Sequence, residues 1–236
     1  MKLFILILLG LLLATSGMLA QTGTIIAGAG AVYHMPVGTL HNRFASAVGG
    51  MLYVGQQTSA NWTWVGKFEY VEFSALNSDK LYKTINLQEG GVTQQYQIPL
   101  NKLSMDLTVG GVTAEAILNL VRWSSIETNA HVGFGFYKWE NVRGSYYDSL
   151  FVQSSVTGAR VKAAVLAVPE NRQTDWSGSL NLGADLSVKI AEPVWFTLGA
   201  DYRLIVAELW PALDLDLENV AGLQSISLRG GIKVEF

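Results

Sequence analysis

The last twelve residues of the chain, residues 225–236, read SISLRGGIKVEF and decide the fold. Every second position is apolar or glycine, and the positions between them include Arg229, Lys233 and Glu235. Side chains of a β-strand point alternately to opposite faces, so this segment has one apolar face and one charged face. Moving a cation from that face to the middle of a bilayer would cost about 2–4 kcal/mol. We therefore expect the charged face to line the interior of a membrane β-barrel.

The same alternation continues upstream of this segment. In the segment 104–121, Met105, Leu107 and Val109 have the parity expected to face lipid and Asp106 the parity expected to face the interior. The parity then changes at residues 110–111, where we expect a β-bulge. The sequence predicts an all-β, antiparallel up-and-down barrel of about eight strands: 24–34, 44–56, 61–75, 104–121, 128–141, 176–190, 194–206 and 226–236. The first two are rich in glycine and alanine and apolar at both parities, so they are assigned mostly from their position.

The connections between these strands are alternately long and short. The longest are 76–102 and 142–175, which we expect to be surface loops, and an even number of strands returns both termini to the periplasm. Gly158 could form a turn within the loop 142–175. This loop is expected to be either a hairpin projecting above the membrane or a surface that binds a partner. If the hairpin joins the barrel instead, the barrel has ten strands.

The N-terminus has the pattern of a cleaved signal peptide. Lys2 precedes an apolar run that is too short to span a bilayer, and small residues follow it. We expect a signal peptide over 1–20 and one barrel domain over 21–236. Cleavage after Ala20 is favoured, with Gly17 as the alternative.

Composition excludes several functions. The net charge is −3, and no basic patch is interleaved with aromatic residues, so nucleic acid is not an expected partner. The chain has no cysteine and therefore no thiolate metal site. Charged residues make up 15% of the chain and hydrophobic residues 50%, as a lipid-facing barrel requires. Neither a cofactor nor a metal is expected.

The interior-facing charges form the candidate site. Because an eight-stranded barrel is narrow, we expect them to pair into a polar network rather than to line an open channel. A gated pore is the alternative. The predicted network consists of Lys67, Glu69, Asp106, Asp185, Asp201, Arg203, Arg229, Lys233 and Glu235.

Aromatic side chains collect near the predicted strand ends, as in the interfacial belts of membrane proteins. Trp62, Trp64, Trp123 and Trp195 are expected at the periplasmic interface. Tyr70, Trp139 and Trp176 are expected at the outer interface.

With its signal peptide, its strand pattern, the stretch 33–38 (YHMPVG) and its terminal strand, the chain resembles the small outer-membrane barrels related to the OmpA transmembrane domain, OmpX and OmpW. The resemblance implies a bacterial outer-membrane protein in contact with outer-membrane lipid and lipopolysaccharide. It also implies that Ile232, Val234 and Phe236 form the signal read by the barrel-assembly machinery. We expect no peptidoglycan-binding domain after the barrel, in contrast to OmpA itself.

We expect a non-enzymatic, porin-like membrane anchor whose loops 76–102 and 142–175 bind an extracellular ligand or partner, or which passes small solutes, including apolar ones. One alternative is a lipid-modifying enzyme of Gram-negative bacteria. The His-x-Ser element of lipid A deacylases has no match, although His41, Asp148 and Ser149 could approach one another in a palmitoyltransferase-like site. His131 is expected on an interior-facing position as a structural histidine. The other alternative is a soluble, secreted lipocalin-like carrier.

Overall fold

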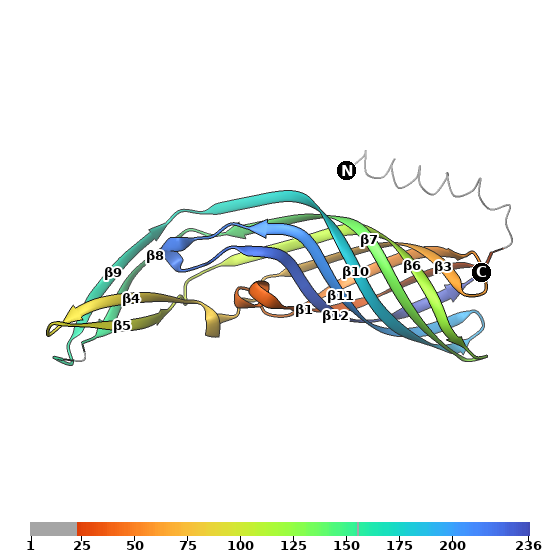
Figure 1. Cartoon of the computed structure of the whole chain (residues 1–236), viewed down its shortest axis with the longest axis horizontal. Coiled ribbons are helices and arrows are strands. Elements are labelled where there is room, and N and C mark those ends of the chain that lie inside the picture. Colours follow the sequence, from red (N-terminus) through yellow and green to blue (C-terminus); the bar gives the residue numbers. More distant parts are fainter. Residues whose placement is uncertain (1–22, 155) are drawn as a thin grey trace.

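The structure is a computed structural model that describes residues 23–154 and 156–236, so the predicted signal peptide lies outside the described residues. Eight antiparallel strands close into a barrel in the order β1-β12-β11-β10-β7-β6-β3-β2 (Figure 1). This confirms the predicted fold. The barrel strands are β1 (Ile25–Pro36), β2 (Ala47–Gln57), β3 (Trp62–Phe73), β6 (Met105–Arg122), β7 (Ile126–Arg143), β10 (Asn171–Ala191), β11 (Val194–Leu209) and β12 (Val220–Glu235).

Two further hairpins stand outside the barrel. One joins β4 (Tyr82–Glu89) to β5 (Val92–Pro99), and the other joins β8 (Tyr146–Gln153) to β9 (Arg160–Val168). Each is a separate two-stranded sheet, so the alternative of a ten-stranded barrel is wrong. The hairpins lie together at one end of the molecule, with β4 beside β9 and β5 beside β8, and the C-terminus lies at the opposite end (Figure 1).

Within the described residues, the helical elements are three 3-10 turns in the connections on the hairpin side of the barrel: η1 (Gly38–Asn42), η2 (Ser78–Lys80) and η3 (Leu213–Leu215). Across residues 23–154 and 156–236, no helix is both long and apolar enough to cross a membrane.

Several barrel strands are longer than a bilayer requires. A membrane-spanning strand needs about 9–11 residues. Strand β10 has 21 residues, and β6 and β7 have 18 each. These strands therefore continue beyond the bilayer on the side of the hairpins.

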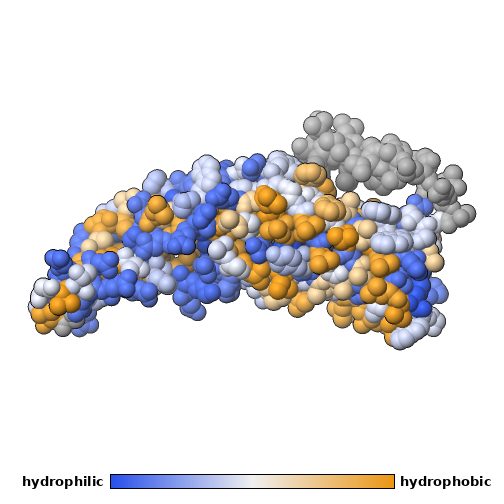
Figure 2. Space-filling view, in the orientation of Figure 1, coloured by the Kyte–Doolittle hydropathy of each residue, from blue (hydrophilic) through white to orange (hydrophobic). Residues whose placement is uncertain are grey.

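The barrel half near the C-terminus has an apolar exterior. Figure 2 shows hydrophobic residues gathered over this half, with more hydrophilic residues toward the hairpins. The exterior residues here include Leu52, Phe68, Val112, Phe134, Phe136, Leu182, Leu198 and Leu228. An exposed apolar surface of this kind around a closed barrel is the surface that lipid covers.

The interior of the other half is apolar. We call the following buried side chains the outer plug: Leu40, Phe44, Val71, Phe73, Leu81, Leu100, Leu103, Met105, Leu107, Val109, Tyr137, Trp139, Tyr146, Leu150, Leu166, Val168, Ile205, Leu209, Leu215, Leu217, Val220 and Leu223. They come from the barrel strands, the β8–β9 hairpin and the connections, including Leu81 and Leu100 at the base of the β4–β5 hairpin. The hairpin end is therefore packed like the core of a water-soluble protein.

The orientation of strand β6 in the outer plug differs from the prediction. Met105, Leu107 and Val109 face the interior, and Asp106 is exposed on the exterior, opposite to the expected orientation. No bulge occurs at residues 110–111, because β6 stays in register there with both β3 and β7, and its register shift lies between Asn119 and Val121. The strand keeps its alternation, and the change in apolar parity marks its passage from lipid into water.

Two predicted belt residues also face inward. Trp139 is buried in the outer plug, where its indole N–H donates to Ser177 Oγ at 2.9 Å. Trp195 is buried at the other end of the barrel, and the ammonium of Lys233 lies 4.6 Å from its ring centroid. Both predictions were wrong because position near a strand end was given more weight than strand parity.

Tyr137 lies between the apolar and the charged parts of the interior. The guanidinium of Arg203 lies 4.9 Å from its ring centroid, so this ring of the outer plug contacts the charged part of the interior directly. Gly111 makes room for the ring, since a Cβ there would lie 2.6 Å from Tyr137 Cδ1.

Candidate functional site

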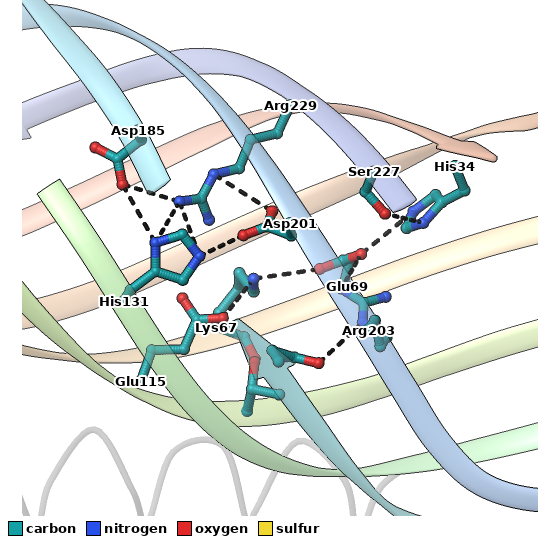
Figure 3. A network of polar contacts seen from close by, with 12 residues as sticks. His34, Lys67, Glu69, Glu115, His131, Asp185, Asp201, Arg203, Ser227 and Arg229 are labelled. Atoms are coloured by element: carbon teal, nitrogen blue, oxygen red, sulfur yellow. Dashed lines mark hydrogen bonds and ion pairs between the residues drawn. The ribbon is translucent and has the colours of Figure 1, made fainter. Parts of the chain in front are cut away.

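The first part of the site is an ion-pair cluster around Glu69. Strand alternation turns Lys67 and Glu69 of β3, Glu115 of β6 and Arg203 of β11 into the barrel (Figure 3). Glu69 Oε1 lies 2.6 Å from Arg203 Nη2, and Lys67 Nζ lies 3.5 Å from Glu69 Oε2 and 2.5 Å from Glu115 Oε1. All four side chains are buried. Such pairing offsets part of the large cost of removing ions from water.

A second cluster surrounds Arg229 of β12. Its guanidinium lies 2.9 Å from Asp185 and 3.6 Å from Asp201. His131 contacts Asp201 through Nε2, and its Nδ1 lies 3.6 Å from Asp185 (Figure 3). Asn129 donates to Asp185 Oδ1 at 2.8 Å. Each of the two carboxylates thus contacts more than one polar or cationic partner, and His131 is a buried histidine with a structural role.

A third cluster lies toward the C-terminal end of the barrel. Lys233 Nζ lies 2.7 Å from Glu127 and 2.9 Å from Glu235. Arg122 Nε lies 2.5 Å from Glu127 Oε1. Acids and bases alternate in this cluster, so no side chain in it offers a free charge to a passing ion.

Of the nine network residues expected from the sequence, Asp106 alone is outside the interior. The structure brings together Lys67, Glu69, Asp185, Asp201, Arg203, Arg229, Lys233 and Glu235 in the three clusters. The sequence reasoning missed Glu115, Glu127 and Arg122. Strand β6 alternates without interruption, so Glu115 lies on the same interior face as Met105, a face that was predicted to point toward lipid at Met105.

A hydroxyl, an imidazole and a carboxylate also lie in a chain in the interior. Ser227 Oγ is 2.8 Å from His34 Nδ1, and His34 Nε2 is 3.2 Å from Glu69 Oε1 (Figure 3). The order resembles that of a hydrolase triad. However, Ser227 is 0% exposed and His34 is 1% exposed. The cavity beside His34 has a volume of about 20 Å³, which accommodates one water and no substrate.

A second cavity in the interior lies on the C-terminal side of the Glu69 cluster. Its volume is about 60 Å³, and its lining includes Tyr53, Lys67, Glu115, Arg122 and Lys233. This is room for a few waters and far below the roughly 300 Å³ of a ligand site. Within the described ranges, no group of acidic and histidine side chains is arranged to hold a metal ion.

The palmitoyltransferase-like combination does not form. The backbone carbonyl of His41 accepts from Asn77 at 2.9 Å, and its ring Nε2 lies 3.4 Å from the same amide. Asp148 lies 2.7 Å from Lys102 Nζ and also accepts from the backbone N–H of Ser149. His41 and Asp148 thus have separate partners.

The other predicted residues lie on the exterior or at the chain end. Trp62, Trp64, Trp123, Tyr70 and Trp176 are exposed on the outer surface. Ile232, Val234 and Phe236 share the outward parity of β12. The backbone of Phe236 exchanges two hydrogen bonds with Ile25, which closes the barrel at this end.

The sequence matches no protein-family model and no curated protein. The fold, however, is similar to that of solved outer-membrane proteins. A major outer membrane protein from Thermus thermophilus aligns with a TM-score of 0.50 and 12% identity, over 92% of this chain and 100% of its own. Neisserial surface protein A (NspA) aligns at 0.48 and 14%, over 91% and 99%. Ail, the attachment invasion locus protein of Yersinia pestis, aligns at 0.43 and 13%, over 92% and 100%. The chain is thus a membrane β-barrel protein with the fold of the small bacterial outer-membrane barrels.

Proposed function

We propose that this protein is a non-enzymatic anchor of the bacterial outer membrane that holds the β4–β5 and β8–β9 hairpins outside the cell as a binding surface, with both termini in the periplasm. The observation that carries the proposal is that the interior of the barrel is filled by two successive layers of side chains. The charged clusters fill the membrane-spanning half, and the outer plug fills the half beyond it. A barrel closed in this way supports an anchor better than a channel.

The hairpins are attached rigidly enough to act as a binding surface. Lys83 Nζ lies 2.6 Å from Asp216 Oδ1, and the backbone N–H of Thr84 donates to Asp216 Oδ2 at 2.7 Å. Tyr146 and Leu166 at the base of β8–β9 are buried in the outer plug. The tips meet, because a Cβ on Gly90 would lie 3.7 Å from Val156 Cγ2.

One face of the β8–β9 hairpin carries the residue types that dominate binding energy in protein interfaces. Tyr147 is 72% exposed, and Phe151 and Val165 are exposed on the same face. The guanidinium of Arg160 lies 4.6 Å from the Phe151 ring centroid. Exposed aromatic and arginine side chains in one patch favour a protein or other macromolecular partner.

Two measurements test the anchor and the direction of the hairpins. In planar bilayers the purified protein is expected to show conductance near zero, and well-resolved single-channel openings would contradict the closed interior.

Trypsin added to intact cells is expected to cut after Arg160 or Lys162, both exposed near the β8–β9 tip, while the barrel stays protected. Cutting only after the outer membrane is permeabilised would place the hairpins in the periplasm.

Two further measurements separate the alternatives. The protein is expected in the outer-membrane fraction after detergent extraction, whereas a lipocalin-like carrier would be soluble. Lipid A mass spectra from cells with and without the protein are expected to be identical. The burial of His34 and Ser227 supports this expectation, and a change in acyl chains would favour the lipid-modifying enzyme instead.

A further inference from the structure

Lys138 is an isolated cation on the outside of the barrel. It is exposed on the outward parity of β7, where the four preceding outward positions are Ala130, Val132, Phe134 and Phe136. In the part of the chain that the structure describes, Lys138 makes no ion pair. Along the outward face of β7, Lys138 is therefore the first charged residue after four apolar positions.

Strand register places Lys138 between two aromatic side chains. It pairs with Trp176 of β10 on one side and with Gly110 of β6 on the other, and Gly110 in turn pairs with Tyr70 of β3. A Cβ on Gly110 would lie 3.2 Å from Tyr70 Cδ2, so the tyrosine ring leans over the glycine toward the lysine. Tyrosine and tryptophan favour the depth of the lipid headgroups, which sets the level of this row in the membrane.

The rows on either side of Lys138 differ in chemistry. Toward the membrane, Phe136 pairs with Val112 and with Gly178, and a Cβ on Gly178 would meet nothing within 4 Å. This leaves an open apolar strip below the lysine. Away from the membrane, Glu140 forms an ion pair with Arg172, with 3.0 Å between Glu140 Oε1 and Arg172 Nε.

Two further acids, Glu72 and Asp106, lie on the water side of the row. Glu72 of β3 is exposed there, in register with Thr108 of β6, which pairs with Glu140. The positive charge thus lies on the lipid side of the acidic row, where a headgroup phosphate can reach it.

We propose that Lys138, Tyr70 and Trp176 form a binding site for a phosphate group of lipid A in the outward-facing leaflet, with an acyl chain lying on the open strip beside Phe136. The proposal rests on the membrane placement given above, because the hairpin side of the apolar wall is then the outer leaflet. Lysine is a common phosphate ligand, and Tyr70 and Trp176 would hold the glycolipid backbone at the interface. A lysine that merely extends toward water without preferring a phosphate is the competing explanation.

Native mass spectrometry of the detergent-solubilised full chain, titrated with diphosphoryl lipid A, tests the site. The Lys138→Gln variant is expected to bind about fivefold more weakly, the contribution typical of one basic side chain near an anionic membrane surface. Lys138→Arg is expected to retain binding, because it keeps the charge. Lys162→Gln, at an exposed lysine of the β8–β9 hairpin, is the matched control and is expected to bind as the unmodified chain does.

Each of the following results would overturn the proposal: an unchanged affinity in Lys138→Gln, an equal loss in Lys162→Gln, or a loss that appears with phosphatidylglycerol but not with lipid A. Phosphatidylcholine has a phosphodiester whose charge is offset by a quaternary ammonium group, so it is expected to bind all variants alike, and a Lys138→Gln effect with this lipid would contradict a preference of Lys138 for the phosphates of lipid A. A failure of the proposed function is distinguishable: a chain that stays soluble without detergent refutes the membrane anchor, whereas a membrane-inserted barrel indifferent to Lys138 refutes only the lipid site.

Discussion

The two halves of the barrel have opposite organisation, although the same strands build both. In the half near the C-terminus, ion pairs such as Arg203–Glu69 fill the interior and apolar side chains such as Leu182 cover the exterior. In the half near the hairpins, Leu107 and its neighbours fill the interior, and Asp106 faces outward. Alternation by itself therefore does not say which face is apolar. The surrounding solvent does, and the level at which the pattern reverses marks the edge of the membrane.

The largest expected effect concerns the ion pairs of the membrane half. Replacing Arg203 with methionine leaves Glu69 buried without its nearest cation, 2.6 Å away. We expect a loss of about 3–5 kcal/mol in the free energy of unfolding. Urea unfolding of the protein in lipid vesicles, followed by tryptophan fluorescence, measures it.

The matched control is the exposed pair Arg172–Glu140, with a separation of 3.0 Å. Arg172→Met is expected to cost no more than about 1 kcal/mol, because water screens an exposed pair. Equal losses in the two variants would mean that the interior of the barrel is wet, and the contrast between the two halves would fail.

The next effect concerns the outer plug. Leu107 is 0% exposed, so Leu107→Ala leaves a cavity among close-packed neighbours and is expected to lower the free energy of unfolding by about 2–5 kcal/mol. Thr108→Ala, one residue further along β6 and on the opposite face, is expected to stay within about 0.5 kcal/mol. The same unfolding assay measures both. A larger loss at Thr108 would restore the original assignment, in which the outer part of β6 presents Leu107 to lipid.

A third pair of variants locates the membrane edge. Leu182→Arg puts a cation on the apolar exterior and is expected to cost about 2–4 kcal/mol if lipid covers that position. Asp106→Arg puts the same side chain on the exterior of the hairpin half and is expected to change stability by less than about 0.5 kcal/mol. Efficiency of refolding into vesicles gives the comparison. Equal tolerance of arginine at both positions would show that the two exteriors share one solvent.

The sequence predicted the membrane half well because one rule governs it. Apolar-out alternation holds without interruption in segments such as 176–190 and 226–236, so these strands and most of the ion-pair network could be identified, whereas 24–34 and 44–56 are apolar at both parities and were assigned from their position. Pairing partners could not, since strand register depends on contacts between segments distant in sequence. His34 and Glu69 meet only because β1 and β3 are two places apart in the closed barrel.

The hairpin half was predicted less well for a physical reason. The prediction for β6 assumed that lipid surrounds the whole strand. The change of apolar parity at Gly110 was therefore explained by a bulge, and Glu115 was assigned neither to the interior nor to the exterior. In the segment 76–102, the β4–β5 hairpin was not predicted at all. Its strands are rich in glutamine and threonine, and its clearest signal is the pair Gly90–Gly91, whose positive φ angles of 59° and 84° make a tight hairpin turn.

The smallest expected effect concerns the attachment of the β4–β5 hairpin to the rim of the hairpin half. Asp216 has a φ of 54°, a conformation that asparagine also tolerates, so Asp216→Asn removes the charge facing Lys83 without straining the backbone. We expect global stability to fall by no more than about 1 kcal/mol, because both side chains are partly exposed. Hydrogen exchange at the amide of Thr84, which donates to Asp216, is expected to become faster while the barrel amides are unaffected. Asp79→Asn, at an exposed acid of η2, is expected to leave the Thr84 amide unchanged. If Asp216→Asn instead accelerated exchange throughout the outer plug, the hairpin would be an integral part of that core, and the attachment would be as important to the hairpin half as the ion pairs are to the membrane half.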